Sequence, residues 1–264
     1  MQFADGKILA EVKDGVGTIT FNQPEKRNAM SIAMWDGLAA ALDHFAADAT
    51  VRCVVLTGAG DKAFVSGADI SQFEQSRSDA EAQRAYGRMT LGGRRKLATF
   101  PKPVIAKIRG FCMGGGLGIA MSCDIRIAAE GSEFGIPAAR LGIAYGFDMV
   151  KNLVALVGPA HAHMILMTGA RFPAEEALRM GLINKLVPAA ELDEAVAALT
   201  RQIAENAPLS LIANKRTVQA VLADPAERDL AAIEAAADAC FDSQDYVEGR
   251  RAFMEKRKPV FTGR

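Results

Sequence analysis

The chain has 264 residues, and its 31 lysine and arginine residues are balanced by 31 aspartate and glutamate residues. This balance excludes a global positive field of the kind that draws nucleic acid or anionic membranes to a protein. Half of the residues are hydrophobic, and the longest glycine-and-apolar run, residues 111–121, is too short to span a bilayer. We expect a globular protein with a substantial core, without a nucleic-acid or membrane partner.

The N-terminal residues and the cysteines indicate the compartment. Charged residues stand near the N-terminus where a signal peptide needs an apolar stretch. The four cysteines have no spacing typical of a metal site. We expect them to be reduced, buried thiols in a cytoplasmic protein that has no metal. They are Cys53, Cys112, Cys123 and Cys240.

The first half of the chain alternates strand and helix patterns. Residues 8–12 and 16–22 flank Asp14-Gly15 and predict a hairpin. Apolar residues at spacings of three and four predict a helix over 31–47, with Ser31 as its N-cap. The further elements expected here are a strand over 53–58, a helix over 79–98, a strand over 104–108, a helix from the glycines to about 122, and extended structure over 124–129.

Beyond residue 145, helical patterns dominate, and the clearest strand signal is LINKLV at 182–187. The sequence therefore predicts an α/β core over 1–195 and a helical C-terminal region over 196–264. Helices are expected over 146–157, 160–168, 174–180, 191–206, 208–222, 227–243 and 245–257.

The glycine run in GFCMGGGLGIA, residues 110–120, needs an explanation because glycine costs a helix interior about 1 kcal/mol relative to alanine. A dinucleotide fingerprint fails, since the third glycine would fall on Ile119. Tight packing of the helix start against strand 104–108 is one open explanation. An oxyanion site is the other, because the first turn of a helix has unpaired N–H groups and glycine exposes them.

A second amide donor could come from AFVSGADI, residues 63–70, where Ser66-Gly67-Ala68 leaves the backbone exposed. Two such donors would stabilise a thioester carbonyl that becomes an enolate, and each contributes about 2.7–4 kcal/mol.

These two segments together resemble the crotonase superfamily, the enoyl-CoA hydratase/isomerase family. In that family, F-x-x-G-A-D-[IL] and G-G-G-x-x-x-A-x-x-C-D supply the paired donors, and this chain has FVSGADI at 64–70 and GGGLGIAMSCD at 114–124. FNQPEKRNAM at 21–30 is similar to the family's first CoA-contacting loop, PKPVIAKIRGFCMGGG to its central strand and turn, and EGRRAFMEKRKPVF at 248–261 to its C-terminal helix.

The resemblance implies a ClpP/crotonase-like spiral of ββα units with a helical C-terminal region. It implies an acyl-CoA substrate, no cofactor beyond the CoA moiety of that substrate, and a homotrimer or a hexamer formed by two trimers. The implied oxyanion donors are the backbone N–H groups of Ala68 and Gly115. The implied CoA-contacting residues are Lys26, Arg27, Lys62, Ala68, Asp69 and Ile70, and a basic patch over 250–258 is either a further CoA contact or a solvated helix face.

The sequence departs from the family pattern at the two acid–base residues. Hydratases of this family use two glutamates, and the corresponding positions here are Gly118 and Ala138. Isomerase, decarboxylase or other enolate chemistry is therefore favoured over hydration. The alternatives are a genuine hydratase with relocated acid–base groups and a non-catalytic acyl-CoA-binding protein.

Two residues near the expected pocket could handle protons. Tyr145 is a catalytic candidate or an apolar wall of the acyl pocket, and Asp148 is a catalytic candidate or a carboxylate that favours a helix N-terminus. Less favoured candidates are Glu74, Glu81 and Glu133, and Arg140 could pair with a carboxylate on the substrate or have a surface role. The three histidines do not form a nucleophile arrangement with a serine.

Overall fold

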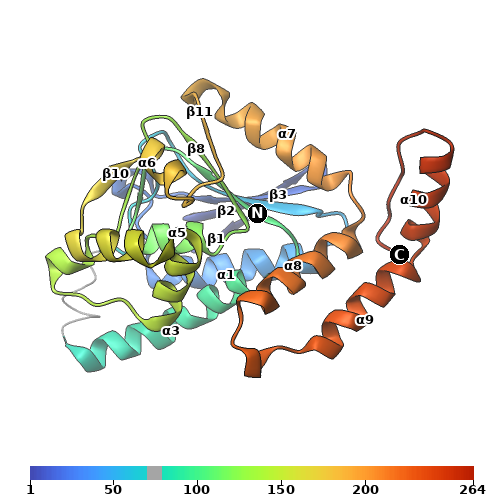
Figure 1. Cartoon of the computed structure of the whole chain (residues 1–264). Coiled ribbons are helices and arrows are strands. Elements are labelled where there is room, and N and C mark those ends of the chain that lie inside the picture. The colour runs from blue at the N-terminus through green and yellow to red at the C-terminus, as the bar shows by residue number, and fades with distance from the viewer. Residues whose placement is uncertain (70–78) are drawn as a thin grey trace.

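The computed structural model describes residues 1–69 and 79–264, and the strands in these ranges form two sheets (Figure 1). The larger sheet has seven strands in the order β1-β2-β3-β4-β6-β8-β11, and the smaller has four in the order β10-β9-β7-β5. The larger contains β1 (Gln2–Phe3), β2 (Ile8–Lys13), β3 (Val16–Phe21), β4 (Cys53–Gly58), β6 (Val104–Ile108), β8 (Ile125–Ala129) and β11 (Lys185–Val187). The smaller contains β5 (Ala63–Val65), β7 (Phe111–Met113), β9 (Glu133–Gly135) and β10 (Arg171–Pro173).

The chain passes from the larger sheet to the smaller one in repeated turns. β4 leads to β5, β6 leads to β7, and β8 leads to β9. Within each sheet, these strands pair in parallel with the strands of the next turn. This arrangement is the spiral of strand–strand–helix units that the resemblance implies, so the expected fold class is confirmed.

The β2–β3 hairpin is confirmed, and its turn explains its sequence. Asp14 and Gly15 have φ of 50° and 76°. A two-residue turn with both φ values positive matches the twist of the flanking strands, and aspartate followed by glycine suits it.

The expected helices form with small changes at their ends. Ser31 caps α1 by accepting a hydrogen bond from the Met34 N–H at 3.3 Å. The two helices expected over 146–168 are one element, α5, with a break at Gly158, where φ is 72°. The helices are α1 (Ile32–Ala47), α3 (Ala80–Ala98), α4 (Gly115–Met121), α5 (Phe147–Thr168), α6 (Ala174–Arg179), α7 (Leu192–Ala204), α8 (Pro208–Leu222), α9 (Leu230–Phe241) and α10 (Gln244–Met254). Short 3-10 turns cover Pro24–Lys26, Pro137–Leu141, Ala189–Glu191 and Pro225–Glu227.

Helices cover both faces of the larger sheet (Figure 1). On one face, Leu38 and Leu42 of α1 join the main hydrophobic core. On the other face, Leu192 and Val196 of α7 pack with Val55 of β4. Burial on both faces explains why the central strands are continuous apolar runs without polar alternation.

The C-terminal helices extend from this core. Lys215 of α8 donates hydrogen bonds to the Lys102 carbonyl at 2.9 Å and to Asp124 Oδ2 at 2.8 Å. α9 and α10 then project away from the sheets, at the right in Figure 1. Arg52 holds the returning tail by donating to the Phe261 carbonyl at 2.9 Å. The division of the chain near residue 195 stays a prediction, and α7 spans that position.

Helix α5 is the one helix of the described residues that is long and apolar enough to cross a membrane by length and composition. Its Leu153, Val157 and Ile165 are buried in the main core, and its backbone breaks at Gly158. These contacts fit a helix that packs against the core.

Candidate active site

Two turns lie side by side at one edge of the smaller sheet. β5 and β7 pair in parallel, with Ala63 opposite Phe111 and Val65 opposite Cys112. Since parallel strands end at the same edge of a sheet, the segments that follow them are brought together. One segment carries Gly67-Ala68, and the other carries Gly114-Gly115.

The backbone around Ala68 aims its N–H group away from the neighbouring strand segment. Met30 donates to the Gly67 carbonyl at 2.8 Å, and Asp69 donates to the Met30 carbonyl at 3.0 Å. Successive N–H groups of extended backbone alternate in direction, so the Ala68 N–H points to the opposite side from Met30. In the part of the chain that the structure describes, no hydrogen bond from the Ala68 N–H or the Gly115 N–H is found.

The two amides are close enough for one ligand atom to lie between their segments. A Cβ built on Gly115 would lie 3.8 Å from the Ala68 nitrogen, and a Cβ built on Gly67 would lie 4.0 Å from the Gly115 nitrogen. Glycine at these positions therefore keeps the space between the amides open. Gly115 begins α4, where the N–H groups have no partner within the helix.

The remaining glycines of the run have different roles. Gly114 has φ 52° and ψ −116°, a conformation that only glycine adopts readily. Gly116 packs against β5, because a Cβ there would overlap the backbone of Val65. Gly116 thus packs tightly, but against β5 and not against strand 104–108 as expected, whereas Gly115 faces the space between the two amides.

The start of α5 covers α4. The Tyr145 hydroxyl lies 3.4 Å from where a Cβ on Gly114 would stand. A Cβ on Gly118 would overlap the terminal methyl of Met149 and lie 3.5 Å from its sulfur. Tyr145 and Met149 are half-buried and pack against the main core. Asp148, in contrast, is exposed in the first turn of α5.

At the two positions where the resemblance led us to expect glutamate, the chain has Gly118 and Ala138. Met149 fills the space beside Gly118, and Ala138 is buried in the turn Pro137–Leu141. Among the less favoured candidates, Glu133 pairs with Arg171 at 3.6 Å, and Glu81 lies in the first turn of α3. Arg140 is exposed. Glu74 and the expected CoA contact Ile70 lie outside the described residues.

Two of the expected CoA-contacting residues bind each other. Lys26 Nζ and Asp69 Oδ2 form an ion pair at 2.7 Å, in which the Asp69 side chain is 8% exposed and the Lys26 side chain 48%. This pair joins the loop before α1 to the segment that carries Ala68. The structure therefore gives Asp69 a positioning role, while Lys26 keeps an exposed surface.

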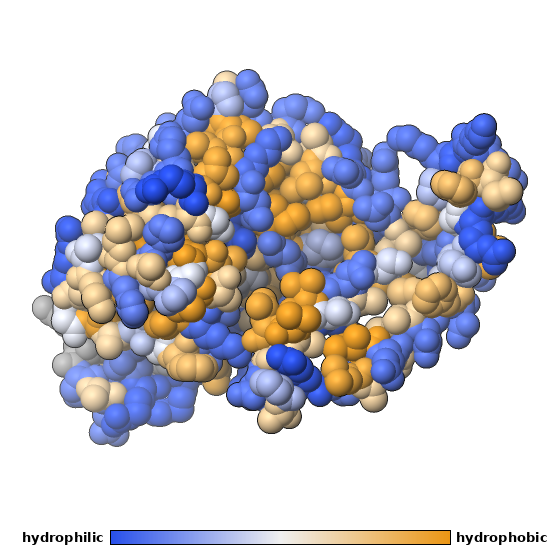
Figure 2. Space-filling view, in the orientation of Figure 1, coloured by the Kyte–Doolittle hydropathy of each residue, from blue (hydrophilic) through white to orange (hydrophobic). Residues whose placement is uncertain are grey.

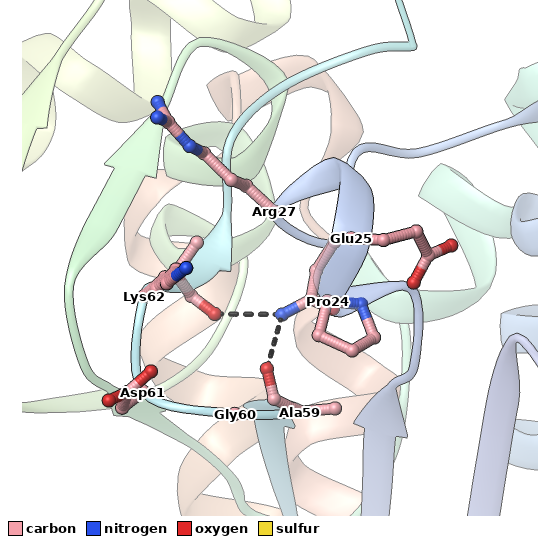
Figure 3. Close-up of a pocket in the computed structure, with 9 residues that line it drawn as sticks. Pro24, Glu25, Arg27, Ala59, Gly60, Asp61 and Lys62 are labelled. Carbon is pink, nitrogen blue, oxygen red and sulfur yellow. Dashed lines mark hydrogen bonds between the residues drawn. The ribbon is translucent and has the colours of Figure 1, made fainter.

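Arg27 and Lys62 line a cleft of about 260 Å³ between the loop at 24–28 and the loop at 59–63 (Figure 3). Asn28 joins the two walls by donating to the carbonyls of Ala59 at 3.0 Å and Ala63 at 2.8 Å. In Figure 3 the Arg27 side chain extends away from Asp61.

The Phe111 ring, at the start of β7, contacts two arginines. The guanidinium carbons of Arg27 and Arg171 lie 5.1 Å and 5.2 Å from the centroid of the Phe111 ring. Such contacts hold a cation while leaving its N–H groups able to bind an anion. Asn28 stands within FNQPEKRNAM but was not expected to take part in the site, and Arg171 and Met149 belong to none of the quoted motifs.

The cysteines have no catalytic character. Burial raises the pKa of the Cys53 thiol to about 12 and that of Cys123 to about 12. Burial also raises the pKa of Cys112 well above its ordinary value. Because the thiolate is the nucleophile, these three thiols are inert, and their expected burial is confirmed. Cys240 is half-buried. Among the described residues, no cluster of His, Cys, Asp or Glu could hold a metal ion.

The C-terminal cations are largely paired within the chain. Glu248 accepts hydrogen bonds from Arg251 at 2.7 Å and Arg257 at 2.6 Å, and these bonds lower the pKa of Glu248 below its ordinary value. Lys258 lies 3.4 Å from Glu205. These cations are therefore less available to an anionic ligand than their sequence pattern suggests.

Comparison with known proteins gives consistent matches over the whole chain. A short-chain-enoyl-CoA hydratase of Clostridium acetobutylicum is 36% identical over 253 residues, covering 95% of each protein. A carnitinyl-CoA dehydratase of Salmonella typhi is 34% identical over 251 residues, covering 93% of this chain and 94% of that protein. The crystal structure of an enoyl-CoA hydratase/carnithine racemase from Magnetospirillum magneticum superposes with a TM-score of 0.91 at 38% identity, covering 98% of this chain and 96% of that chain.

The family model described as enoyl-CoA hydratase/isomerase matches residues 11–264. With the spiral of paired strands and the two adjacent turns already in place, this match is decisive: the chain belongs to the enoyl-CoA hydratase/isomerase family.

Proposed function

We propose that the protein is an acyl-CoA thioester enzyme in which the Ala68 and Gly115 amides form an oxyanion hole for a thioester enolate. The observation that carries this proposal is the approach of the two turns, each with a glycine that keeps the other's amide accessible. Preorganised N–H donors stabilise the charge that develops on the carbonyl oxygen in the transition state. No cofactor beyond the CoA moiety of the substrate is needed for this chemistry.

The surroundings of the hole favour decarboxylation or double-bond isomerisation over hydration. In decarboxylation, the bond between Cα and the leaving carboxylate breaks, its electron pair enters the enolate, CO₂ departs, and Cα then takes a proton. That reaction needs a proton donor and no base. Isomerisation needs a group that first removes a proton from the acyl chain and then returns it.

Tyr145 is the proton-handling residue that we favour. Its hydroxyl lies beside Gly114, next to the proposed hole. A phenol carries an O–H group that can donate a proton. This property suits the protonation of an enolate and places decarboxylation first. Asp148 ranks second because it is exposed.

A panel of acyl-CoA esters followed by mass spectrometry tests the proposal. The panel contains a 2-carboxyacyl-CoA, a 3-enoyl-CoA and crotonyl-CoA. We expect the 2-carboxyacyl-CoA to lose CO₂, or the 3-enoyl-CoA to change its retention time without a change in mass. Failure of the protein to bind or convert any of the three would contradict the proposed function.

Replacing Tyr145 with phenylalanine should lower kcat by about 10²- to 10⁴-fold with little change in KM, because a positioned acid contributes that much. Steady-state kinetics on the best substrate of the panel measures this effect. Asp148→Asn, three residues along the chain from Tyr145, is the matched comparison. We expect its kcat and KM to be nearly unchanged. A large loss in Asp148→Asn with none in Tyr145→Phe would reverse the two roles.

Hydration is the second candidate reaction, because relatives at 36% identity are named short-chain-enoyl-CoA hydratase and crotonyl-CoA hydratase. It would require acid–base groups other than the two glutamates. A non-catalytic acyl-CoA-binding protein is the third, and any turnover above the uncatalysed rate would exclude it.

For the CoA moiety, we propose the cleft that Arg27 and Lys62 line. Cations from two loops suit the phosphates, and the cleft opens at the same β5–β7 region that leads to Ala68. Lys26, held by Asp69, lies on the same loop as Arg27.

We propose a cytoplasmic homotrimer or a hexamer formed by two trimers. Figure 2 shows hydrophobic residues gathered over the region of α8 and α9, where Val218, Val221 and Leu230 are exposed. Phe241 of α9 and Phe253 of α10 are 63% and 82% exposed. Exposed apolar side chains of this size favour contact with another protein surface.

A further inference from the structure

Two pairs of residues link α4 to the start of α5. Gly114 faces the Tyr145 hydroxyl, and Gly118 faces the Met149 methyl. Each pair is four residues from the other on both segments, so the second pair lies about one helical turn, roughly 5.4 Å, along α4 from the first. We take the acyl chain to run along α4 from the carbonyl oxygen held at Gly115, so that it reaches the second pair within a few atoms.

Met149 fills the space that a side chain at position 118 would occupy. The overlap with a Cβ on Gly118 involves the terminal methyl of Met149, and the rest of the thioether packs against the main core. The wall at this point is therefore apolar, and it offers no hydrogen bond to a hydroxyl group. A hydroxyl that is buried against such a surface loses its water without gaining a partner.

We propose that Met149 is the specificity-determining residue of the acyl pocket. It selects acyl groups with an apolar β-carbon and disfavours 3-hydroxyacyl-CoA. This inference rests on the proposed function, because it assumes that the thioester oxygen is held by the Ala68 and Gly115 amides. It adds a substrate class, namely acyl-CoA esters whose β-carbon carries no hydroxyl group on the side that faces Met149.

Calorimetric binding of butyryl-CoA and 3-hydroxybutyryl-CoA tests the proposal without requiring turnover. We expect the wild-type protein to bind butyryl-CoA at least about 10-fold more tightly, within the range seen for one group in a hydrophobic pocket. Met149→Gln keeps the length of the side chain and supplies hydrogen-bonding groups, so it should narrow this ratio by about 10-fold. Met164→Gln on the exposed side of α5 is the matched control and should leave the ratio unchanged.

The outcomes separate the two proposals. Equal binding of both esters by the wild-type protein, or an unchanged ratio in Met149→Gln, would overturn the role of Met149 while the proposed function stands. Binding of neither ester would overturn the proposed function.

Thermal unfolding gives a second measurement that does not depend on a ligand. Gly118→Ala should change Tm more favourably in a Met149→Ala background than in the wild-type background, because alanine favours a helix interior and its methyl meets the terminal methyl of Met149 only in the wild-type background. The same change in both backgrounds would show that Met149 does not fill this space in solution.

Discussion

Gly115→Pro should lower kcat by about 10²–10³-fold and leave the chain folded. The substitution removes the Gly115 N–H, one of the two proposed donors, and loss of one oxyanion donor typically lowers kcat by about 10²–10³-fold, or 2.7–4 kcal/mol. Folding should survive because Gly115 is the first residue of α4, where proline is well tolerated. Kinetics on the best acyl-CoA substrate and circular dichroism measure the two effects.

Gly115→Ala distinguishes the effect of losing the N–H group from the effect of crowding around it. This variant keeps the N–H and adds a methyl group 3.8 Å from the Ala68 nitrogen. If the amide is the essential group, Gly115→Ala should retain much more activity than Gly115→Pro. Full activity in the proline variant would contradict the oxyanion hole, and equal loss in both variants would assign the effect to crowding.

Hydration of crotonyl-CoA should be slow in the wild-type protein. Each missing glutamate corresponds to about 10²–10⁴-fold in rate. We therefore expect a kcat at least about 10⁴-fold below the roughly 10³ s⁻¹ of a fast enzyme. Loss of the enoyl thioester absorbance, followed directly with purified protein, provides the measurement.

Restoring the carboxylates tests the cause of this slow rate. Gly118→Glu alone should gain little, because Met149 occupies the required space. The combination of Gly118→Glu, Met149→Ala and Ala138→Glu should raise the hydration rate above that of the single variant. A wild-type kcat near 10³ s⁻¹ would instead show that other groups, such as Glu74, perform the acid–base steps.

The elements with a strong local pattern could be predicted from sequence, whereas the short strands β5 and β7 could not. α1 has an N-cap and a repeating apolar face, and the β2–β3 hairpin has a diagnostic turn, so local chemistry determines both. β5 and β7 have three residues each, too few for a period to appear. They exist because they pair with each other, and neither was predicted as a strand.

The residues of the candidate site also differ in whether they could be predicted from the sequence. The glycines that keep Ala68 and Gly115 accessible stand in motifs, so they could be found from their spacing. Met149 could not, because its effect depends on contact with a residue 31 positions earlier in the chain, Gly118. Asn28 is similar, since it is buried where it joins two loops that are remote in sequence.

The contact between Gly118 and Met149 also constrains how such a chain could acquire a glutamate during evolution. A glutamate at position 118 would have to displace the terminal methyl of Met149 before it could assist a reaction. A smaller residue at position 149 would remove that methyl and would also lose its packing against the main core. The contact therefore couples the two positions, so that a mutation at one alters the effect of a mutation at the other.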